Sequence, residues 1–246
     1  MGYLKQIKIL IKLGNISLPM LESSVPNHIA IILDGNRRYA RKLGIPQLKG
    51  HEKGFNKIKE LLEWCMELGV KELTLYCFST ENFNRDKKEV NYLFDLFRKK
   101  IEGFKKDKQI HDNKVKISVI GRISMFPEDM QKSMKEIMEM TKDYGNYKLN
   151  LALAYGGRSE IVDAVKRLVK EGKEISEESI TSSLYLPDDV DLMIRPGGEK
   201  RLSNFLLWQN SYSELYFSDK LWPEFSKDDL REAVEWFKSR ERRMGK

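Results

Sequence analysis

The sequence predicts one α/β domain, a mainly parallel six-stranded sheet flanked by helices. Short apolar, strand-like segments alternate with longer segments of helical periodicity, as in a parallel sheet with helices on both faces. Residues 29–33 form an unbroken apolar run, which is typical of a strand buried on both faces. The chain has 246 residues, of which 41% are hydrophobic, so it can build one substantial core. No repeat, low-complexity tract or linker divides residues 26–246, and we therefore expect a single domain there.

Residues 1–25 have the pattern of a basic amphipathic leader, in which apolar residues are interleaved with Lys5, Lys8 and Lys12. The apolar stretch is too short and too interrupted by lysines to be a secretory signal. Two interpretations stay open. The leader is a helix that lies at a membrane surface or over an apolar site, or it is a helix docked on the body of the protein.

The first half of the domain predicts two strands and two long helices. After the strand at residues 29–33, a helical pattern over residues 54–69 ends at a glycine, and a strand over residues 72–78 follows. The next helix begins at Asp86 and carries an apolar stripe that is typical of core packing. Because Asp86 and Glu89 have capping-box spacing, we expect both side chains to cap this helix.

The second half predicts four more strands. They cover residues 115–120, 148–154, 190–194 and 214–217. A methionine-rich helix is expected between the first two of these strands, and a helix capped at Ser159 follows the second. A final helix starts near Ser226, with Asp229 at the capping-box position.

The composition restricts the partners and the setting of the protein. A net charge of +7 favours anionic partners, but no dense Lys/Arg run or nucleic-acid motif is present, so we expect no nucleic-acid partner. The two cysteines, Cys65 and Cys77, form no CxxC pair, and a reducing cytoplasm is the simplest setting. The three histidines are not at zinc-ligand spacing. No apolar run approaches the ~20 residues that span a bilayer.

Polar, glycine-rich and basic residues follow the predicted strands at their carboxyl ends. These segments are residues 34–38, 79–85, 121–122, 156–158 and 195–203. Open α/β sheets bind ligands along that edge. Asp34 is a carboxylate where a divalent cation can sit between protein and phosphate oxygens, and Arg37 and Arg38 add positive charge. The edge therefore suits a phosphorylated substrate with a metal ion, although an ordinary strand-turn-helix junction capped by Asp34 has the same local pattern. No nucleotide motif (GxxxxGK[ST] or GxGxxG) follows the first strand.

Six segments together resemble the cis-prenyltransferases, the undecaprenyl and dehydrodolichyl diphosphate synthases. In order and spacing, these segments are residues 28–40, 50–51, 78–85, 155–158, 195–209 and 240–245. The resemblance runs from about Pro26 to the end of the chain. The Asn-Arg-Arg-Tyr form at residues 36–39 is more similar to archaeal and eukaryotic members than to bacterial ones.

The resemblance implies a hydrophobic tunnel, a homodimer and Mg²⁺ as cofactor. The implied reaction condenses isopentenyl diphosphate repeatedly onto an allylic diphosphate, farnesyl or geranylgeranyl. The product is a long-chain polyprenyl diphosphate, the precursor of a glycosyl carrier lipid. The implied place is the cytoplasm, with peripheral contact to the membrane surface as the alternative that the leader leaves open.

The resemblance also implies roles for individual residues. Asp34 would bind Mg²⁺ and help the allylic diphosphate to leave, Asn82 would orient a water or phosphate oxygen during proton removal, and Glu214 would be a second metal-facing carboxylate. The positions implied for the allylic diphosphate are Gly35, Asn36, Arg37, Arg38, Tyr39 and His51. Those implied for a mobile loop over the reacting ends are Ser79, Thr80, Glu81, Phe83 and Arg85, together with Asn82. Those implied for isopentenyl diphosphate are Arg195, Arg201, Leu202 and Ser203, with Arg243 and Gly245 completing the neighbouring subunit's site.

Three positions depart from the family pattern, and two other functions stay open. Gln47 stands where many members have arginine, Pro196 replaces a threonine, and Lys200 stands where some bacterial members have a metal-contacting histidine. The alternatives are a non-catalytic accessory subunit of the same fold and a polyprenyl- or phosphate-binding module without turnover.

Overall fold

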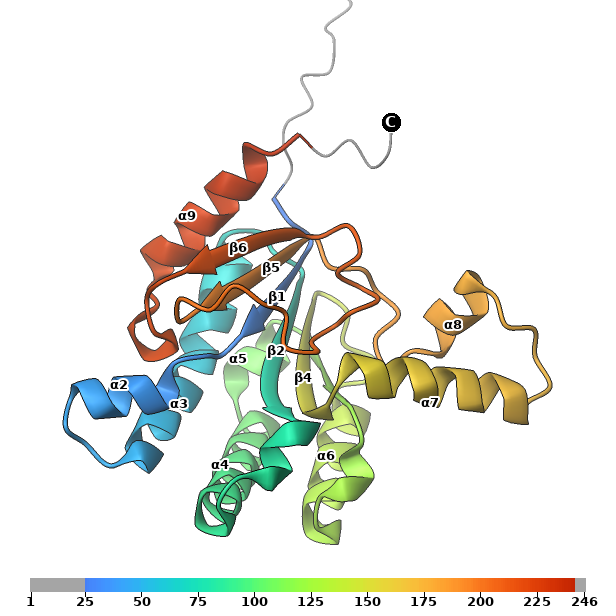
Figure 1. Ribbon diagram of the computed structural model, residues 1–246, viewed down its shortest axis with the longest axis horizontal. Coiled ribbons are helices and arrows are strands. Elements are labelled where there is room, and N and C mark those ends of the chain that lie inside the picture. Colours follow the sequence, from blue (N-terminus) through green and yellow to red (C-terminus); the bar gives the residue numbers. More distant parts are fainter. Residues whose placement is uncertain (1–24, 242–246) are drawn as a thin grey trace, which may run out of the picture.

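A computed structural model describes residues 25–241, and it contains one parallel sheet with helices on both faces (Figure 1). The strand order is β3-β4-β2-β1-β5-β6, and every neighbouring pair is parallel. The strands are β1 (His28–Ile32), β2 (Glu72–Ser79), β3 (Val115–Ile120), β4 (Tyr147–Tyr155), β5 (Leu192–Pro196) and β6 (Glu214–Ser218). The predicted fold class is therefore confirmed. The predicted leader lies outside the described residues, apart from Val25.

Eight helices and three short 3₁₀ turns connect these strands within residues 25–241. The helices are α2 (Asn36–Lys42), α3 (Gln47–Glu67), α4 (Lys87–Lys105), α5 (Lys108–Asp112), α6 (Glu128–Met140), α7 (Gly157–Lys170), α8 (Glu177–Ser183) and α9 (Lys227–Lys238). The 3₁₀ turns are η1 (Thr80–Asn84), η2 (Ile123–Met125) and η3 (Trp222–Glu224). None of these helices is long and apolar enough to cross a bilayer.

The sheet separates two apolar clusters, and strand β1 contributes to both of them. Ile29 and Ile31 belong to the larger cluster, which the apolar stripes of α3, α4, α6 and α9 complete. Ala30 and Ile32 point to the smaller cluster on the opposite face. All five residues of β1 are buried, which explains why this strand is apolar without alternation.

Two predicted helix starts and one predicted cap differ from the structure. Helix α3 begins at Gln47 and not at Gly54, so Gly50 and Gly54 lie inside it. A Cβ at Gly50 would lie 2.1 Å from the carbonyl oxygen of Asn36, so glycine is needed where α3 approaches α2 this closely. Helix α7 begins at Gly157, and Ser159 does not cap it. Asp86 caps α4 as predicted, but the side chain of Glu89 points elsewhere.

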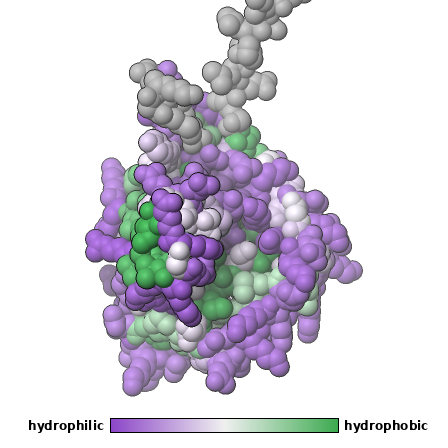
Figure 2. Space-filling view, turned by 90° about the vertical axis from the view of Figure 1, so that its right-hand side faces the viewer, coloured by the Kyte–Doolittle hydropathy of each residue, from purple (hydrophilic) through white to green (hydrophobic). Residues whose placement is uncertain are grey.

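The carboxyl ends of the strands lie at one edge of the molecule, and the two ends of the described chain lie at the other (Figure 1). Helices α7 and α8 project at one side, where the surface is mostly hydrophilic with small apolar patches (Figure 2). The apolar residues exposed there include Val162 and Val169 on α7. The polar edge, and not this side, contains the cavities described next.

Candidate active site

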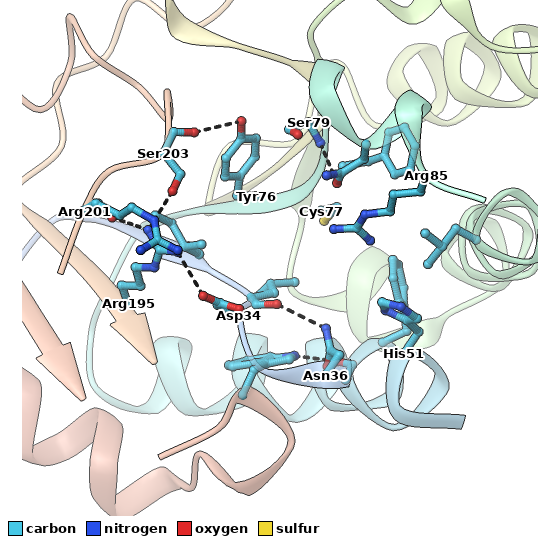
Figure 3. Close-up of a pocket in the computed structure, with 18 residues that line it drawn as sticks. Asp34, Asn36, His51, Tyr76, Cys77, Ser79, Arg85, Arg195, Arg201 and Ser203 are labelled. Atoms are coloured by element: carbon cyan, nitrogen blue, oxygen red, sulfur yellow. Dashed lines mark hydrogen bonds and ion pairs between the residues drawn. The ribbon is translucent and has the colours of Figure 1, made fainter. Parts of the chain in front are cut away.

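A cavity of about 260 Å³ lies at the carboxyl ends of β1, β2 and β5. Its polar lining is Asp34, Asn36, His51, Tyr76, Ser79, Asn82, Arg85, Arg195, Arg201 and Ser203. Figure 3 shows Arg195 and Arg201 on one side, His51 and Arg85 on the other, and Asp34 between them. The structure thus brings together side chains from four of the segments that the sequence singled out.

Asp34 occupies the turn between β1 and α2, and two arginines hold its carboxylate. One oxygen lies 2.9 Å from Arg195 Nη2, and the other lies 3.2 Å from Arg38 Nη2. The turn depends on Gly35, whose φ of 106° is in the left-handed region. The Asp34 side chain is 27% exposed, whereas that of Arg195 is only 4% exposed, so the carboxylate faces the cavity in front of a buried cation.

Arg195 also fixes the loop that follows β5. Its Nη1 donates to Ser203 Oγ at 2.8 Å and to the Arg201 carbonyl. Arg38 donates to the carbonyl of Gly197 at 2.6 Å, and a Cβ at Gly197 would meet Arg38 Nη2 at 2.8 Å. Guanidinium groups from both β5 and α2 therefore hold this loop by hydrogen bonds.

The same loop contains three non-glycine residues with left-handed backbone conformations. These are Ser203, Asn204 and Leu206, with φ of 50°, 64° and 45°. Tyr76 supports the strained segment, because its hydroxyl lies 3.3 Å from the carbonyl oxygens of both Ser203 and Tyr155. Such conformations persist only where surrounding contacts impose them. Tyr76 was not among the predicted site residues, because inside an apolar strand it reads as a core residue.

Glu89 is a second residue whose contacts with the site the sequence did not predict. It is buried on α4, and one of its oxygens lies 3.1 Å from both His51 Nε2 and Arg85 Nη1. Its other oxygen accepts a hydrogen bond from Gln47 at 2.9 Å. Glu89 thus connects two cavity residues from different elements. The (i, i+4) spacing of Arg85 and Glu89 is typical of an ion pair on a helix. The capping-box spacing of Asp86 and Glu89 favoured a helix cap instead, and it was the cap that we predicted.

His51 is a buried imidazole in contact with the Glu89 carboxylate. Burial lowers its pKa below the usual value of about 6.5, and the Glu89 carboxylate offsets this only in part. Because Nε2 faces a carboxylate, the geometry assigns the ring proton to Nε2 and leaves Nδ1 as an acceptor. Burial likewise lowers the pKa of Arg85, but a guanidinium stays charged at any physiological pH.

A second cavity, of about 430 Å³, adjoins the first at Asp34. Arg37, Arg38 and Arg41 line it, together with Arg85 and His51. The first cavity has its own basic residues in Arg195 and Arg201. Two basic cavities that share one carboxylate can hold two anionic groups side by side.

The predicted mobile loop is a short, capped turn in this structure. Asn82 Oδ1 accepts a hydrogen bond from the Ser79 backbone at 3.1 Å, and Thr80 donates to Glu81 at 3.2 Å. Glu81 also accepts from Asn204 Nδ2 at 3.1 Å, which ties η1 to the loop after β5. Phe83 packs on Phe78, with 5.0 Å between ring centroids.

Several predicted site residues lie elsewhere. Glu214 starts β6 at the amino edge of the sheet, 3.3 Å from Arg240 Nε. In the strand register, Glu214 pairs with Leu192, and Leu192 pairs with Ile29. Ile29 lies five residues before Asp34, so the carboxylates of Glu214 and Asp34 are about 16 Å apart along the strands. Within one chain the two carboxylates therefore do not lie together. Tyr39 and Leu202 line neither cavity. Arg243 and Gly245 lie outside the described residues.

An apolar cavity lies behind the polar one, between the sheet and helices α3 and α4. It shares Phe55 and Cys77 with the polar cavity, and Phe97, Leu151, three further apolar residues and Lys100 complete its wall. Its volume is about 10 Å³, no more than one water molecule needs. Among the described residues this region is a nearly filled apolar layer and not an open tunnel, so an apolar chain can enter it only if side chains move.

Comparisons with known proteins identify the family of this chain. Residues 32–245 match the family described as "Putative undecaprenyl diphosphate synthase". A relative from Thermoplasma volcanium, named tritrans,polycis-undecaprenyl-diphosphate synthase (geranylgeranyl-diphosphate specific), is 48% identical over 96% of this chain and 98% of its own length. A relative of the same name from Thermococcus kodakarensis is 49% identical over 91% of this chain and 88% of its own length.

Solved structures give the same result. Lavandulyl diphosphate synthase from Lavandula x intermedia, in complex with dimethylallyl diphosphate, aligns with a TM-score of 0.82 and 34% identity over 90% of this chain and 99% of its own. A probable undecaprenyl diphosphate synthase from Campylobacter jejuni aligns with a TM-score of 0.79 and 37% identity over 91% of this chain and 100% of its own. The chain therefore belongs to the undecaprenyl diphosphate synthase family of cis-prenyltransferases.

Proposed function

We propose that this prenyltransferase extends geranylgeranyl diphosphate with successive isopentenyl diphosphates to a long-chain polyprenyl diphosphate. The observation that carries the proposal is the position of Asp34, where two basic cavities meet above an apolar layer. The names of the archaeal relatives support geranylgeranyl diphosphate over farnesyl diphosphate as the starter.

The two basic cavities suit the two diphosphates of the reaction. The starter's diphosphate would lie against Arg37, Arg38 and Arg85, and that of isopentenyl diphosphate against Arg195, Arg201 and Ser203. Cleavage of the allylic C–O bond leaves negative charge on the departing diphosphate, and prearranged guanidinium groups stabilise that charge. The apolar layer below keeps water from capturing the carbon electrophile before the new C–C bond forms.

Mg²⁺ fits the donor set around Asp34. Residues 25–241 contain no cluster of three or more Asp, Glu, His or Cys side chains that could hold a metal alone. Mg²⁺ commonly binds through one or two carboxylates plus substrate phosphates, so the single carboxylate of Asp34 beside a diphosphate suffices. The ion would add charge neutralisation at the leaving diphosphate. Asp34 itself would align the diphosphate between Arg38 and Arg195.

The proton released at each condensation needs an acceptor near Asn82. Asn82 lines the polar cavity, but an amide is not basic. We therefore assign Asn82 to orienting the diphosphate oxygen or water that takes the proton. Its hydrogen bond to the Ser79 backbone holds the side chain at the cavity wall.

A homodimer would complete the site. The described chain ends beyond α9 at the amino edge of the sheet, where Arg240 contacts Glu214. The tail beyond Arg240 would then bring Arg243 and Gly245 to the site of a second copy.

Product formation with each starter in turn tests the proposal. Purified protein is incubated with labelled isopentenyl diphosphate, Mg²⁺ and either geranylgeranyl or farnesyl diphosphate, and the extracted products are sized by chromatography. We expect one long product, formed faster from geranylgeranyl diphosphate. If folded protein binds diphosphates but makes no product with either starter, it is an accessory subunit or a binding module.

A further inference from the structure

The polar cavity, the apolar cavity and a surface groove lie next to one another. The apolar cavity shares Phe55 and Cys77 with the polar cavity. It shares Phe55 and Lys100 with a groove of about 500 Å³ between α3 and α4. An apolar chain that grew away from Asp34 and displaced the side chains of the apolar cavity would therefore meet Lys100 beside the groove.

Lys100 is the one charged side chain in the wall of the apolar cavity; the other lining residues are Phe55, Ile58, Cys77, Phe97, Ile101, Leu151 and Leu153. Lys100 is half-buried, and its Nζ lies 5.9 Å from the centre of the Phe104 ring. Within residues 25–241, no carboxylate lies within ion-pairing distance of this ammonium group, although Asp107 is near enough to attract it. Burial lowers the pKa of Lys100.

This arrangement opposes the passage of an apolar chain in two ways. The hydrocarbon stem of Lys100 fills space at the end of a cavity that is already nearly full. Its ammonium group would lose hydration if hydrocarbon were to surround it, and a desolvated charge without a partner is costly. An apolar chain that reaches Lys100 can therefore pass it only at a cost in free energy, either by displacing the stem or by desolvating the ammonium group.

We propose that Lys100 closes the outer end of the apolar path between α3 and α4 and so limits the length of the polyprenyl product. The proposal rests on the proposed function, since it presumes that a prenyl chain grows from Asp34 into the apolar cavity. It makes Lys100 a specificity-determining residue, although it touches neither diphosphate cavity.

Substitution at Lys100 tests this directly. Lys100→Ala removes both the stem and the charge and leaves a residue that favours helix. Lys100→Arg keeps the bulk and the charge. Lys99→Ala is the matched control, because Lys99 is exposed and lines only the groove. Each protein receives geranylgeranyl diphosphate, excess isopentenyl diphosphate and Mg²⁺, and both the product length and the rate of the first condensation are measured.

We expect the Lys100→Ala product to be longer than the wild-type product by at least one isoprene unit. Lys100→Arg and Lys99→Ala should keep the wild-type length, and all four proteins should share the rate of the first condensation within about twofold, since Lys100 lies outside the polar cavity. Unchanged or shorter products from Lys100→Ala, or equal lengthening by Lys99→Ala, would overturn the proposal while the proposed function stands. If wild-type protein makes no product, the proposed function fails, and this proposal fails with it.

Discussion

Asp34 and Arg195 form an ion pair of 2.9 Å that joins two neighbouring parallel strands at their carboxyl ends. The arginine is buried and the aspartate faces the cavity, so the pair presents a carboxylate in front of a fixed positive charge. Because Arg195 also holds Ser203 and the Arg201 carbonyl, the same guanidinium couples the starter side of the site to the loop proposed to bind isopentenyl diphosphate.

The Tyr76 hydroxyl is expected to affect the KM for isopentenyl diphosphate but not the KM for the starter. Tyr76→Phe removes the hydroxyl that lies between the Ser203 and Tyr155 carbonyls, which costs about 1 kcal/mol of stability and loosens the loop. The KM for isopentenyl diphosphate should rise about fivefold, in line with that energy, while the KM for the starter stays unchanged. Steady-state kinetics check this. Tyr92→Phe, whose hydroxyl contacts only Glu52 at 3.4 Å, is the control. Equal effects on both substrates would refute the assignment.

Glu89 is expected to position His51 and Arg85 for the starter. Glu89→Gln removes the charge that holds both groups, and hydrogen bonds to charged groups contribute about 1.5–3 kcal/mol. We expect the starter's KM to rise about tenfold or more, with little change for isopentenyl diphosphate. Glu102→Gln on the exposed face of the same helix should leave both constants unchanged. A loss of thermal stability without a change in the starter's KM would mean that Glu89 is only structural.

Gly35 is expected to tolerate no side chain. Its φ is left-handed, and an added Cβ would lie 3.0 Å from the Leu221 side chain. Gly35→Ala should cost about 1–3 kcal/mol in the free energy of unfolding and displace Asp34, with a large loss of activity. Gly172→Ala, at a left-handed position with open space, should cost about 1 kcal/mol and leave activity intact. Denaturant unfolding measures the stability of the two variants, and turnover measures their activity. A Gly35→Ala protein with normal turnover would contradict the role of this turn.

His28 should make stability depend on pH in the mildly acidic range. Its ring is buried between the Asp189 carbonyl and the Thr74 hydroxyl, and burial lowers its pKa. Below about pH 6.5 the unfolded chain binds a proton at this histidine that the folded protein excludes, so stability falls as the pH decreases. The expected slope is up to about 1.4 kcal/mol per pH unit.

Urea unfolding of wild type and His28→Gln between pH 7.5 and 5 measures this slope. The variant should lose the contribution of His28 while keeping that of His51, whose pKa is also lowered. An identical pH dependence in the two proteins would show that His28 takes up its proton in the folded state as readily as in the unfolded one.

The sequence predicted the sheet and its functional edge because both follow from local patterns. Every predicted strand exists, since apolar runs between turn residues are strong local signals. Helix starts were less predictable where distant residues replace local caps. Helix α7 begins at Gly157 because Asn204, far along the chain, accepts hydrogen bonds from the Gly157 and Arg158 backbone. No pattern around Ser159 contains that information.

The contacts of Glu89 and the position of Glu214 could not be predicted for the same physical reason. Glu89 has the spacing of a cap, yet its side chain turns inward because two cations and Gln47 are available there. Glu214 was assigned its role by the family resemblance alone, and only the strand register shows that it lies at the amino edge, away from Asp34 of the same chain. Side-chain partners and register depend on long-range packing, which a single sequence does not encode locally.

The most direct test of the central claim is the first condensation catalysed by Asp34→Asn under single-turnover conditions, with starter binding measured in parallel. Asp188→Asn, which alters a surface ion pair at the far edge of the sheet, is the control. We expect the condensation rate of Asp34→Asn to fall about 100-fold or more, with the fold and diphosphate binding retained. A variant that condenses at close to the wild-type rate would contradict the claim that catalysis is organised around this carboxylate.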